Sequence, residues 1–254
     1  MLSENLSQKA CRRWPSTGMP PKHLPYAKHL PYDNRAMGAH PTPDSNHPQA
    51  HFQSQDSAFV ALIDGAFADA AKRSGPHLLC RPGCAQCCVG VFAIGPADVL
   101  RLNQGLAALS HEDPQRAARV RERAATSWAR LAPQFPGNAT TGALELDPSG
   151  DLVDAFEHFA NYEPCPALDP EHGTCDVYTW RPQTCRVFGP PIAAGEGYGV
   201  CELCFQTATP QEVAQAAIMP PSEERSRTLD GAAVAAGATP GATIVAFVLQ
   251  AEAG

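Results

Sequence analysis

The sequence predicts a small, mainly α-helical domain that is rich in loops and contains little strand. Apolar residues recur at helical spacing in three segments between Asp56 and Leu131. The 25 prolines among the 254 residues are about twice the usual share, which favours short elements joined by loops. No regular alternation of strand and helix is present, so neither a doubly wound sheet nor a barrel is expected.

Residues 1–55 are predicted to be a disordered tail. They contain eight prolines and five histidines but few aliphatic residues, so they offer little apolar area to offset the chain's conformational entropy. The pentapeptide Lys-His-Leu-Pro-Tyr occurs twice, at 22–26 and 28–32, but each copy is too short to form a packed repeat. We interpret the histidines as part of a polar tail rather than as a metal site. Cys11 stands alone there and is left out of the candidate site.

Three longer helices are expected in a central domain that we place at residues 56–229. The first begins near Asp56 and ends where Gly75-Pro76 interrupts its apolar pattern. The second opens at Gly95-Pro96 and carries a buried stripe of leucines. The third covers about 114–131. We interpret its arginines as a solvated face, with a site for an acidic partner as the alternative.

Shorter elements are expected in the remaining sequence. They are a strand at 144–146, a strand or turn at 152–159, and helices at 210–218 and 222–229. Residues 230–254 form an Ala/Gly-rich C-terminal segment that is expected to be flexible over 231–242. The apolar run 243–249 fits either a terminal helix or an edge strand, because its periodicity does not separate the two.

Charge and hydropathy exclude several classes of function. The net charge of -7 argues against general binding to nucleic acid, and no basic stripe interleaved with aromatic residues is present. The longest apolar run, Ala242–Leu249, is far shorter than the ~20 residues that span a bilayer. Met1–Ala10 lacks the apolar core of a signal peptide. We therefore expect a cytoplasmic protein without membrane or nucleic-acid partners, and its protein partners are unknown.

Nine of the ten cysteines fall into two clusters, and these nine are the candidate metal ligands. They are Cys80, Cys84, Cys87, Cys88, Cys165, Cys175, Cys185, Cys201 and Cys204. In a reducing cytoplasm, dense cysteines indicate metal or redox chemistry rather than disulfides. Thiolates two or three residues apart can converge on one centre, and Pro82-Gly83 supplies the tight turn that this requires. Adjacent Cys87 and Cys88 are not expected to point the same way, so they either serve two centres or one of them only packs.

A purely thiolate set suits both Zn²⁺ and an iron–sulfur cluster, for which we expect the 4Fe-4S form. Nine sulfurs exceed the four that one such site needs. Two four-thiolate sites, or one site with an inner and an outer ring, both remain open. Apolar neighbours such as Phe92 and Phe188 would shield a cluster from water, which slightly favours iron–sulfur over zinc.

Other polar residues lie near the cysteines in the sequence. His77 and His172 are interpreted as surface or capping residues, because sulfur ligands are already in surplus. Arg181 and Arg186 flank Cys185, where they offset thiolate charge, bind an anionic ligand, or form structural salt bridges to Asp169 or Asp176. The last of these roles is at least as well supported as the others.

The cysteine motifs resemble those of the YkgJ-type cysteine-cluster family, whose signature is CxxCxxCC. The matching residues are Cys80-x3-Cys84-x2-Cys87-Cys88, Cys165-Pro166-x-Leu168-Asp169, Gly173-x-Cys175-x-Val177-Tyr178 and Arg181-Pro182-x-x-Cys185-Arg186-x-Phe188. The resemblance spans roughly residues 75–205 and implies a bacterial, cytoplasmic chelator of zinc or iron. The chain departs from the signature because three residues, not two, separate Cys80 from Cys84. The placement of the closing Cys201-x2-Cys204 pair also varies within the family.

Two alternative functions stay open. The cysteines are also similar to the cysteine-rich part of the flagellin lysine methylases, which implies an iron–sulfur-dependent methyltransferase-like enzyme that uses S-adenosylmethionine. Cys80-x3-Cys84-x2-Cys87 has the spacing found in radical S-adenosylmethionine enzymes, but Gln86 replaces their usual aromatic residue and no barrel pattern follows. The other alternative is a partner-binding module whose zinc only stabilises the fold. The sequence contains no phosphate-binding loop, His-Glu-x-x-His or GxSxG motif.

Overall fold

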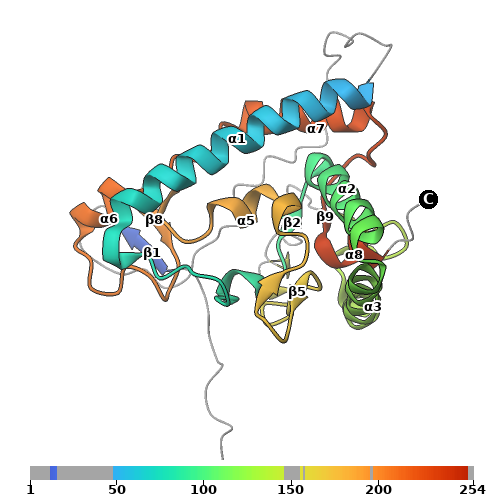
Figure 1. Ribbon diagram of the computed structural model, residues 1–254, viewed down its shortest axis with the longest axis horizontal. Helices are drawn as coiled ribbons and strands as arrows, with labels where there is room; N and C mark the ends of the chain where they lie inside the picture. The colour runs from blue at the N-terminus through green and yellow to red at the C-terminus, as the bar shows by residue number, and fades with distance from the viewer. Residues whose placement is uncertain (1–11, 16–47, 146–154, 157, 195–196, 251–254) are drawn as a thin grey trace, which may run out of the picture. The chain divides into compact units, whose positions relative to one another are not determined.

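The computed structural model describes residues 12–15, 48–145, 155–156, 158–194 and 197–250 (Figure 1). Its described residues are mainly helical, and the strands among them are no longer than four residues. The prediction of a mainly α, loop-rich fold with little strand is confirmed. The predicted tail, residues 1–55, falls largely outside the described residues, as does Cys11.

The chain divides into two compact units. Unit 1 comprises Met1–Tyr26, Leu62–Arg81 and Arg186–Pro220. Unit 2 comprises Ala27–Ala61, Pro82–Cys185 and Pro221–Gly254. Each unit contains residues of both cysteine clusters, so each is described by itself.

Three helices form the main core of unit 2: α2 (Pro96–Glu112), α3 (Pro114–Leu131) and α8 (Val245–Gln250). Both α2 and α3 begin with a proline, whose fixed φ suits the first helical position. The Asp113 side chain caps α3 by accepting a hydrogen bond from the Arg116 backbone N–H. The core side chains include Leu102, Leu106, Val120, Val248 and Leu249, all of them buried.

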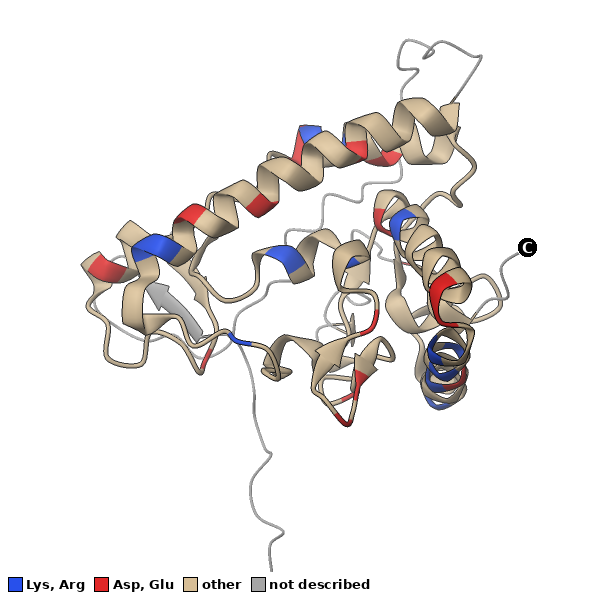
Figure 2. Ribbon diagram, viewed as in Figure 1, with Lys and Arg blue, Asp and Glu red and all other residues tan. Residues whose placement is uncertain are grey.

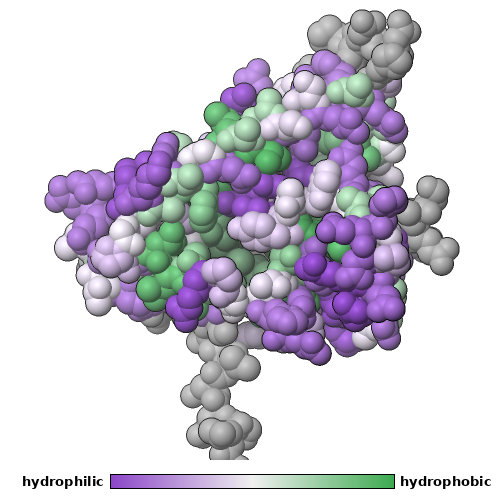
Figure 3. All heavy atoms as spheres, viewed as in Figure 1, coloured by the Kyte–Doolittle hydropathy of each residue, from purple (hydrophilic) through white to green (hydrophobic). Residues whose placement is uncertain are grey.

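Helix α3 is amphipathic. Ala117, Val120, Ala124, Trp128 and Leu131 recur at spacings of three and four, and all of them are buried. Its arginines give the helix the dense basic bands seen in Figure 2. The face of α3 visible in Figure 3 is hydrophilic, as expected when the apolar stripe is turned into the core.

The C-terminal part of unit 2 is more ordered than predicted. Helix α7 (Glu223–Ala235) extends beyond the predicted 222–229, so the expected flexibility of 231–242 is wrong for its first part. Alanine has the highest helix propensity, so the alanines that follow Leu229 continue the helix. The apolar run that fitted either a helix or a strand contains both: β9 (Thr243–Ile244) leads directly into α8. Strand β9 pairs antiparallel with β2 (Ala93–Ile94).

Helix α1 (Pro48–Ser74) begins earlier than the predicted start of order at Asp56, so residues 48–55 belong to a helix. Its first part belongs to unit 2, where Asp56 pairs with the fully buried guanidinium of Arg101. Arg101 also pairs with Asp98 on its own helix. A buried cation is tolerated when carboxylates surround it in this way.

Short hairpins complete unit 2. Strand β3 (Gly137–Asn138) pairs with β4 (Ala143–Leu144), which overlaps the predicted strand at 144–146. Strand β5 (Leu168–Asp169) pairs with β6 (Thr174–Cys175) and brings a cysteine into the sheet. Of the predicted element at 152–159, residues 152–154 and 157 lie outside the described residues, and Phe156 and Phe159 are buried.

Unit 1 contains a small antiparallel sheet of β1 (Arg12–Pro15), β8 (Gly197–Val200) and β7 (Ile192–Ala194), in that order. Helix α6 (Pro210–Ala216) follows a capping box formed by Thr209 and Glu212. The core of this unit contains Val200, Phe205 and Val213 with Cys201 and Cys204. Among the helices in the described residues, none is long and apolar enough to cross a membrane.

Candidate metal centre

Unit 2 gathers most of the predicted sulfur ligands. Its cysteines come from three stretches of the chain that the fold brings together: Cys84, Cys87 and Cys88, then Cys165 and Cys175, then Cys185. All six are half-buried free thiols. Part of the first cysteine cluster (Cys84, Cys87 and Cys88, without Cys80) and part of the second therefore meet in one compact unit.

Cys87 and Cys88 end a single 3-10 turn, η3 (Gln86–Cys88). Their side chains are hydrogen-bonded to each other, which corrects the expectation that adjacent cysteines would not point the same way. The hydrogen bond with Cys88 lowers the pKa of Cys87 to about 7, against the opposing effect of burial, and the charge of Arg181 adds to this lowering. The same hydrogen bond, followed by burial, raises the pKa of Cys88. Within the pair, the Cys87 sulfur therefore loses its proton more readily than the Cys88 sulfur.

A backbone contact places Cys165 beside Cys88. The N–H of Cys165 donates to the carbonyl of Cys88 at 2.7 Å, and the N–H of Gly90 donates to the carbonyl of Glu163 at 2.9 Å. These bonds flank an isolated antiparallel bridge between Val89 and Pro164. This ladder, rather than sequence proximity, joins the two cysteine clusters.

Cys175 is positioned by the β5–β6 hairpin. It lies opposite Leu168, whose N–H donates to the carbonyl of Cys165 at 2.9 Å. The hairpin turn needs glycine at 173, where φ is +65°. A Cβ at this position would also lie 2.9 Å from the carbonyl oxygen of Gly83. The loop that carries Cys84 thus packs against the hairpin that carries Cys175.

Cys185 belongs to the short helix α5 (Gln183–Val187). The first backbone N–H of this helix, from Gln183, donates to Oδ1 of Asp98 at 3.0 Å. Arg101 in turn fixes Asp98 through their buried ion pair. The charged network between α1 and α2 therefore also anchors the helix that presents Cys185.

The surroundings of Cys165, Cys175 and Cys185 favour neutral thiols in the absence of a metal. Burial, followed by the charge of Cys175, raises the pKa of Cys165 to about 12. Burial raises the pKa of Cys175 to about 11 and that of Cys185 well above its ordinary value. The charges of Cys165, Cys175 and Cys87 contribute to the shift at Cys185, so these sulfurs share one electrostatic environment.

Backbone amides are directed at the same sulfurs. The N–H of Ala167 hydrogen-bonds to the sulfur of Cys165, and that of Val177 hydrogen-bonds to the sulfur of Cys175. The Leu168 N–H, which donates to the Cys165 carbonyl, also lowers the pKa of Cys165. Such N–H···S bonds stabilise negative charge on sulfur and are typical around metal-bound thiolates. They therefore point to sulfurs that carry charge when their protons are displaced by a metal.

The arginines of α3 hold the cysteine-bearing loops, which corrects their interpretation as a merely solvated face. Arg116 and Arg123 both pair with Asp176, whose side chain is only 3% exposed. Arg123 also donates to the carbonyl of Pro166 at 2.9 Å, and Arg130 pairs with Glu163. Cys165 and Cys175 thus each have a sequence neighbour clamped to α3. Sequence analysis missed these roles because the partners lie far apart along the chain.

Unit 1 contains a second, smaller sulfur group: Cys80, Cys201 and Cys204. The side chain of Cys204 is hydrogen-bonded to both Cys201 and Cys80, and its sulfur accepts the N–H of Leu79 at 3.4 Å. Cys201 and Cys204 are buried, whereas Cys80 is exposed. The bond with Cys204 and burial raise the pKa of Cys201. The pKa of Cys204 is also raised: the bond with Cys201 lowers it, but the bond with Cys80 and burial outweigh that effect.

The flanking polar residues mostly have structural partners. His172 pairs with Asp169 at 2.6 Å on the surface, and His77 lies 3.6 Å from Glu212 and stacks on Phe205. Arg186 pairs with Asp64 at 2.8 Å.

Arg181 lies over the Tyr178 ring, 4.0 Å from its centroid. The positive charge of Arg181 lowers the pKa of Cys87 and opposes the rise in the pKa of Cys175.

The donor chemistry of unit 2 fits a thiolate-bound metal. It supplies six sulfurs, of which five are coupled by hydrogen bonds or charge, together with amide donors to two of them. Among the described residues, no three or more His, Cys, Asp or Glu side chains are closed around a single point at metal-ligand spacing. The sulfurs of unit 2 therefore share one electrostatic environment but do not form a closed coordination shell in this structure.

Comparison with known proteins agrees with this chemistry. Residues 79–205, half of the chain, match the CxxCxxCC family, which is described as a "Putative zinc- or iron-chelating domain". Neither the curated proteins nor the solved structures gave a match. The matched region contains every cysteine of both sulfur groups. The chain therefore belongs to the CxxCxxCC family of zinc- or iron-chelating domains.

Proposed function

We propose that this protein holds an iron–sulfur cluster through the thiols of unit 2. The observation that carries the proposal is the gathering of Cys87, Cys88, Cys165, Cys175 and Cys185 in one electrostatic environment. Four thiolates suffice for a 4Fe-4S cluster, so this unit can supply a complete set. Cys84 lies on the loop beside the group and is the sixth candidate.

The surroundings favour a cluster over zinc. Cys165 and Cys175 pack against the main apolar core together with Phe92 and Trp180. Apolar packing limits water access to the sulfurs, which stabilises a cluster and tunes its potential. Zn²⁺ is the second candidate, because four thiolates also satisfy its tetrahedral shell. Either metal would displace thiol protons and tie three distant chain segments together.

The small size of the cavity beside Cys165 agrees with a structural or electron-transfer role for the metal. The cavity there, between residues 90–92, 163–166 and 244–246, has a volume of about 20 Å³. This is room for about one water molecule, whereas sites for organic ligands usually measure about 300 Å³ or more. S-adenosylmethionine does not fit in it, so this cavity gives no support to the methyltransferase hypothesis.

The cellular setting is part of the same proposal. Nine cysteines are free thiols in the described residues, which is the state that a reducing cytoplasm maintains. The arginines Arg116, Arg123 and Arg130 are paired with carboxylates, so they offer little to a nucleic-acid backbone. We therefore place the protein in the cytoplasm, with the metal as its principal ligand.

Anaerobic purification followed by elemental analysis and visible spectroscopy tests the proposal. We expect iron and acid-labile sulfide in equal amounts, together with a brown colour that disappears on oxidation. A colourless protein with stoichiometric zinc would show that the bound metal is Zn²⁺ and not an iron–sulfur cluster. A protein with neither metal, after growth and reconstitution with both, would overturn metal binding.

A further inference from the structure

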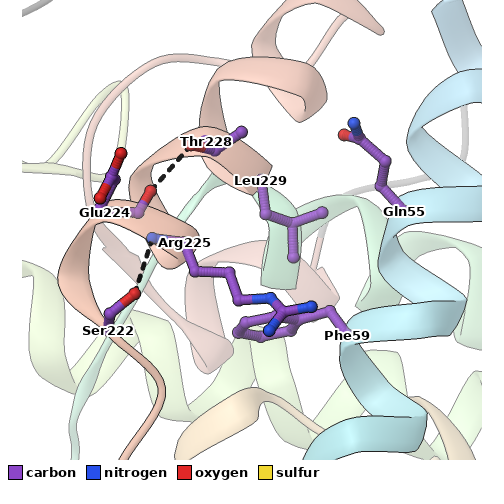
Figure 4. A pocket seen from close by; sticks show the side chains of 7 residues that line it. All are labelled: Gln55, Phe59, Ser222, Glu224, Arg225, Thr228 and Leu229. Atoms are coloured by element: carbon purple, nitrogen blue, oxygen red, sulfur yellow. Dashed lines mark hydrogen bonds between the residues drawn. The ribbon is translucent and has the colours of Figure 1, made fainter.

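A cavity unrelated to the cysteines lies between α1 and α7 in unit 2. Its volume is about 340 Å³, which is within the usual range for sites that bind small organic molecules. Its apolar floor is formed by Phe59 and Leu229, which are 3% and 5% exposed. Gln55 and Phe59 come from α1, and the other lining residues come from the start of α7 (Figure 4).

Two polar groups of this cavity have no protein partner. The Oε1 atom of Gln55 is buried and accepts no hydrogen bond. The Arg225 guanidinium forms no hydrogen bond or ion pair within the part of the chain that the structure describes. A buried carbonyl oxygen without a donor is costly and therefore marks a place where a ligand group is favoured.

The hydroxyl groups of the cavity are already used. The Ser222 Oγ accepts the backbone N–H of Arg225 at 3.3 Å, and the Thr228 hydroxyl donates to the carbonyl of Glu224 at 2.8 Å (Figure 4). The groups left to recognise a ligand are the Arg225 cation and the Gln55 carbonyl oxygen above an apolar floor, with the Glu224 carboxylate also lining the cavity.

We propose that this cavity binds a small organic monocarboxylate with an apolar body and a hydrogen-bond donor at its other end. The carboxylate pairs with Arg225, and the apolar body lies on Phe59 and Leu229. The donor satisfies Gln55 Oε1 when the amide, whose oxygen is closed to solvent in the free protein, turns toward the cavity. Arginine is well suited to this role because its planar guanidinium matches a carboxylate. The site is independent of the metal centre.

Nearby acidic residues narrow the class of ligand. Glu223 and Glu224 lie in the first turn of α7, and Glu224 lines the cavity. Their repulsion grows with the negative charge of the ligand, so dicarboxylates and phosphates are disfavoured relative to a monocarboxylate, whose single charge Arg225 neutralises.

Titration calorimetry of the purified full-length protein tests the site with three probes: 4-hydroxybenzoate, benzoate and benzyl alcohol. We expect 4-hydroxybenzoate to bind best, because it carries both a carboxylate and a hydroxyl donor. Benzoate should bind more weakly, and benzyl alcohol, which lacks the charge, should not bind measurably. Absence of binding by all three probes at millimolar concentration would overturn the proposal.

Three variants locate the binding. Arg225→Gln should weaken 4-hydroxybenzoate by about tenfold or more, since a charged hydrogen bond is lost. Gln55→Leu should abolish the preference for 4-hydroxybenzoate over benzoate. Arg227→Gln, on the same helix but outside the cavity, should leave both affinities unchanged. Equal effects of Arg225→Gln and Arg227→Gln would show only general attraction by charge, and would also overturn the proposal.

Discussion

The two sulfur groups differ in number and in the way they are held. Unit 2 gathers its thiols from three stretches of chain, and ion pairs clamp its loops to α3. Unit 1 gathers three thiols, of which Cys80 is exposed and Cys201 and Cys204 are buried. A four-thiolate centre can be completed within unit 2, whereas unit 1 is one sulfur short among its described residues.

The two groups of cysteines therefore differ in how well their surroundings support metal binding. In unit 2, amide donors and paired arginines surround the sulfurs, so displacement of their protons by a metal is well supported. In unit 1, His77, which precedes Cys80 by three residues, stacks on Phe205 and lies beside Glu212. The ligand role of Cys80, Cys201 and Cys204 stays a prediction.

The largest expected effect comes from removing a sulfur of unit 2. Cys185→Ser should lose the bound metal and reduce soluble expression, because the three stretches would no longer be tied together. Cys204→Ser should keep the unit 2 metal, and Cys11→Ser should match the unaltered protein. Metal content per chain measures all three. If Cys185→Ser and Cys204→Ser lost equal amounts of metal, the two sulfur groups would act as one centre and the distinction between them would be wrong.

The clamp on the cysteine hairpin gives the next effect. Asp176→Asn leaves Arg116 and Arg123 without their shared carboxylate, which should lower the free energy of unfolding by about 3 kcal/mol. Urea unfolding of the metal-free protein measures this directly. Arg119→Gln is the matched control, since Arg119 is exposed on the same helix and has no ion pair with a described residue. A variant as stable as this control would mean that the clamp is not needed.

Unit 1 can be perturbed through a glycine that touches its sulfur group. Gly189 has a φ of +126°, and a Cβ there would lie 2.7 Å from the Cys80 sulfur. Gly189→Ala should therefore destabilise the protein by about 2 kcal/mol through backbone strain and displace Cys80. Gly75 also has a positive φ, +50°, but no atom lies within 4 Å of a Cβ added there. Gly75→Ala should therefore lower the free energy of unfolding by about 1 kcal/mol, through backbone strain alone. Thermal unfolding and the alkylation rate of Cys80 distinguish the two. Identical rates in both variants would contradict the contact.

The smallest effect concerns the surface pair of the hairpin. The bond to Asp169 raises the pKa of His172, and the bond to His172 lowers the pKa of Asp169. The pair therefore stabilises the fold only where histidine is charged and aspartate is ionised. Its contribution is lost as pH rises through the raised histidine pKa, and also as pH falls through the lowered aspartate pKa. Asp169→Asn should slightly lower the melting temperature at pH 5.5 and leave it unchanged at pH 8, and a change of equal size at both values would disprove the assignment.

Local rules predicted much of the fold. Helix α3 begins and ends at the predicted residues, because Pro114 suits a helix start and the apolar stripe ends at Leu131. The C-terminal run was ambiguous because a two-residue strand joins a helix at Ile244, and no single period describes both. Helix α7 was predicted too short because the alanines after Leu229 were interpreted as flexible.

The candidate site was predictable in composition but not in arrangement. The cysteine spacings identified the ligand candidates, and the fold joins the two clusters in both units. The grouping depends on contacts between distant residues, such as the bond from Cys165 to the Cys88 carbonyl. The clamp of Arg116 and Arg123 on Asp176 likewise has no local signal. The spacing of residues along the sequence does not indicate which of several arginines forms an ion pair with a given aspartate.

X-ray absorption spectroscopy at the edge of the bound metal tests the central claim most directly. For the anaerobically purified protein, the proposal predicts an iron site with a first shell of sulfur only, at about 2.3 Å, and a nearby iron neighbour. The signal should vanish in Cys185→Ser and persist in Cys11→Ser. A first shell of nitrogen and oxygen, or an unchanged sulfur shell in Cys185→Ser, would contradict the assignment of the unit 2 thiols as the metal centre.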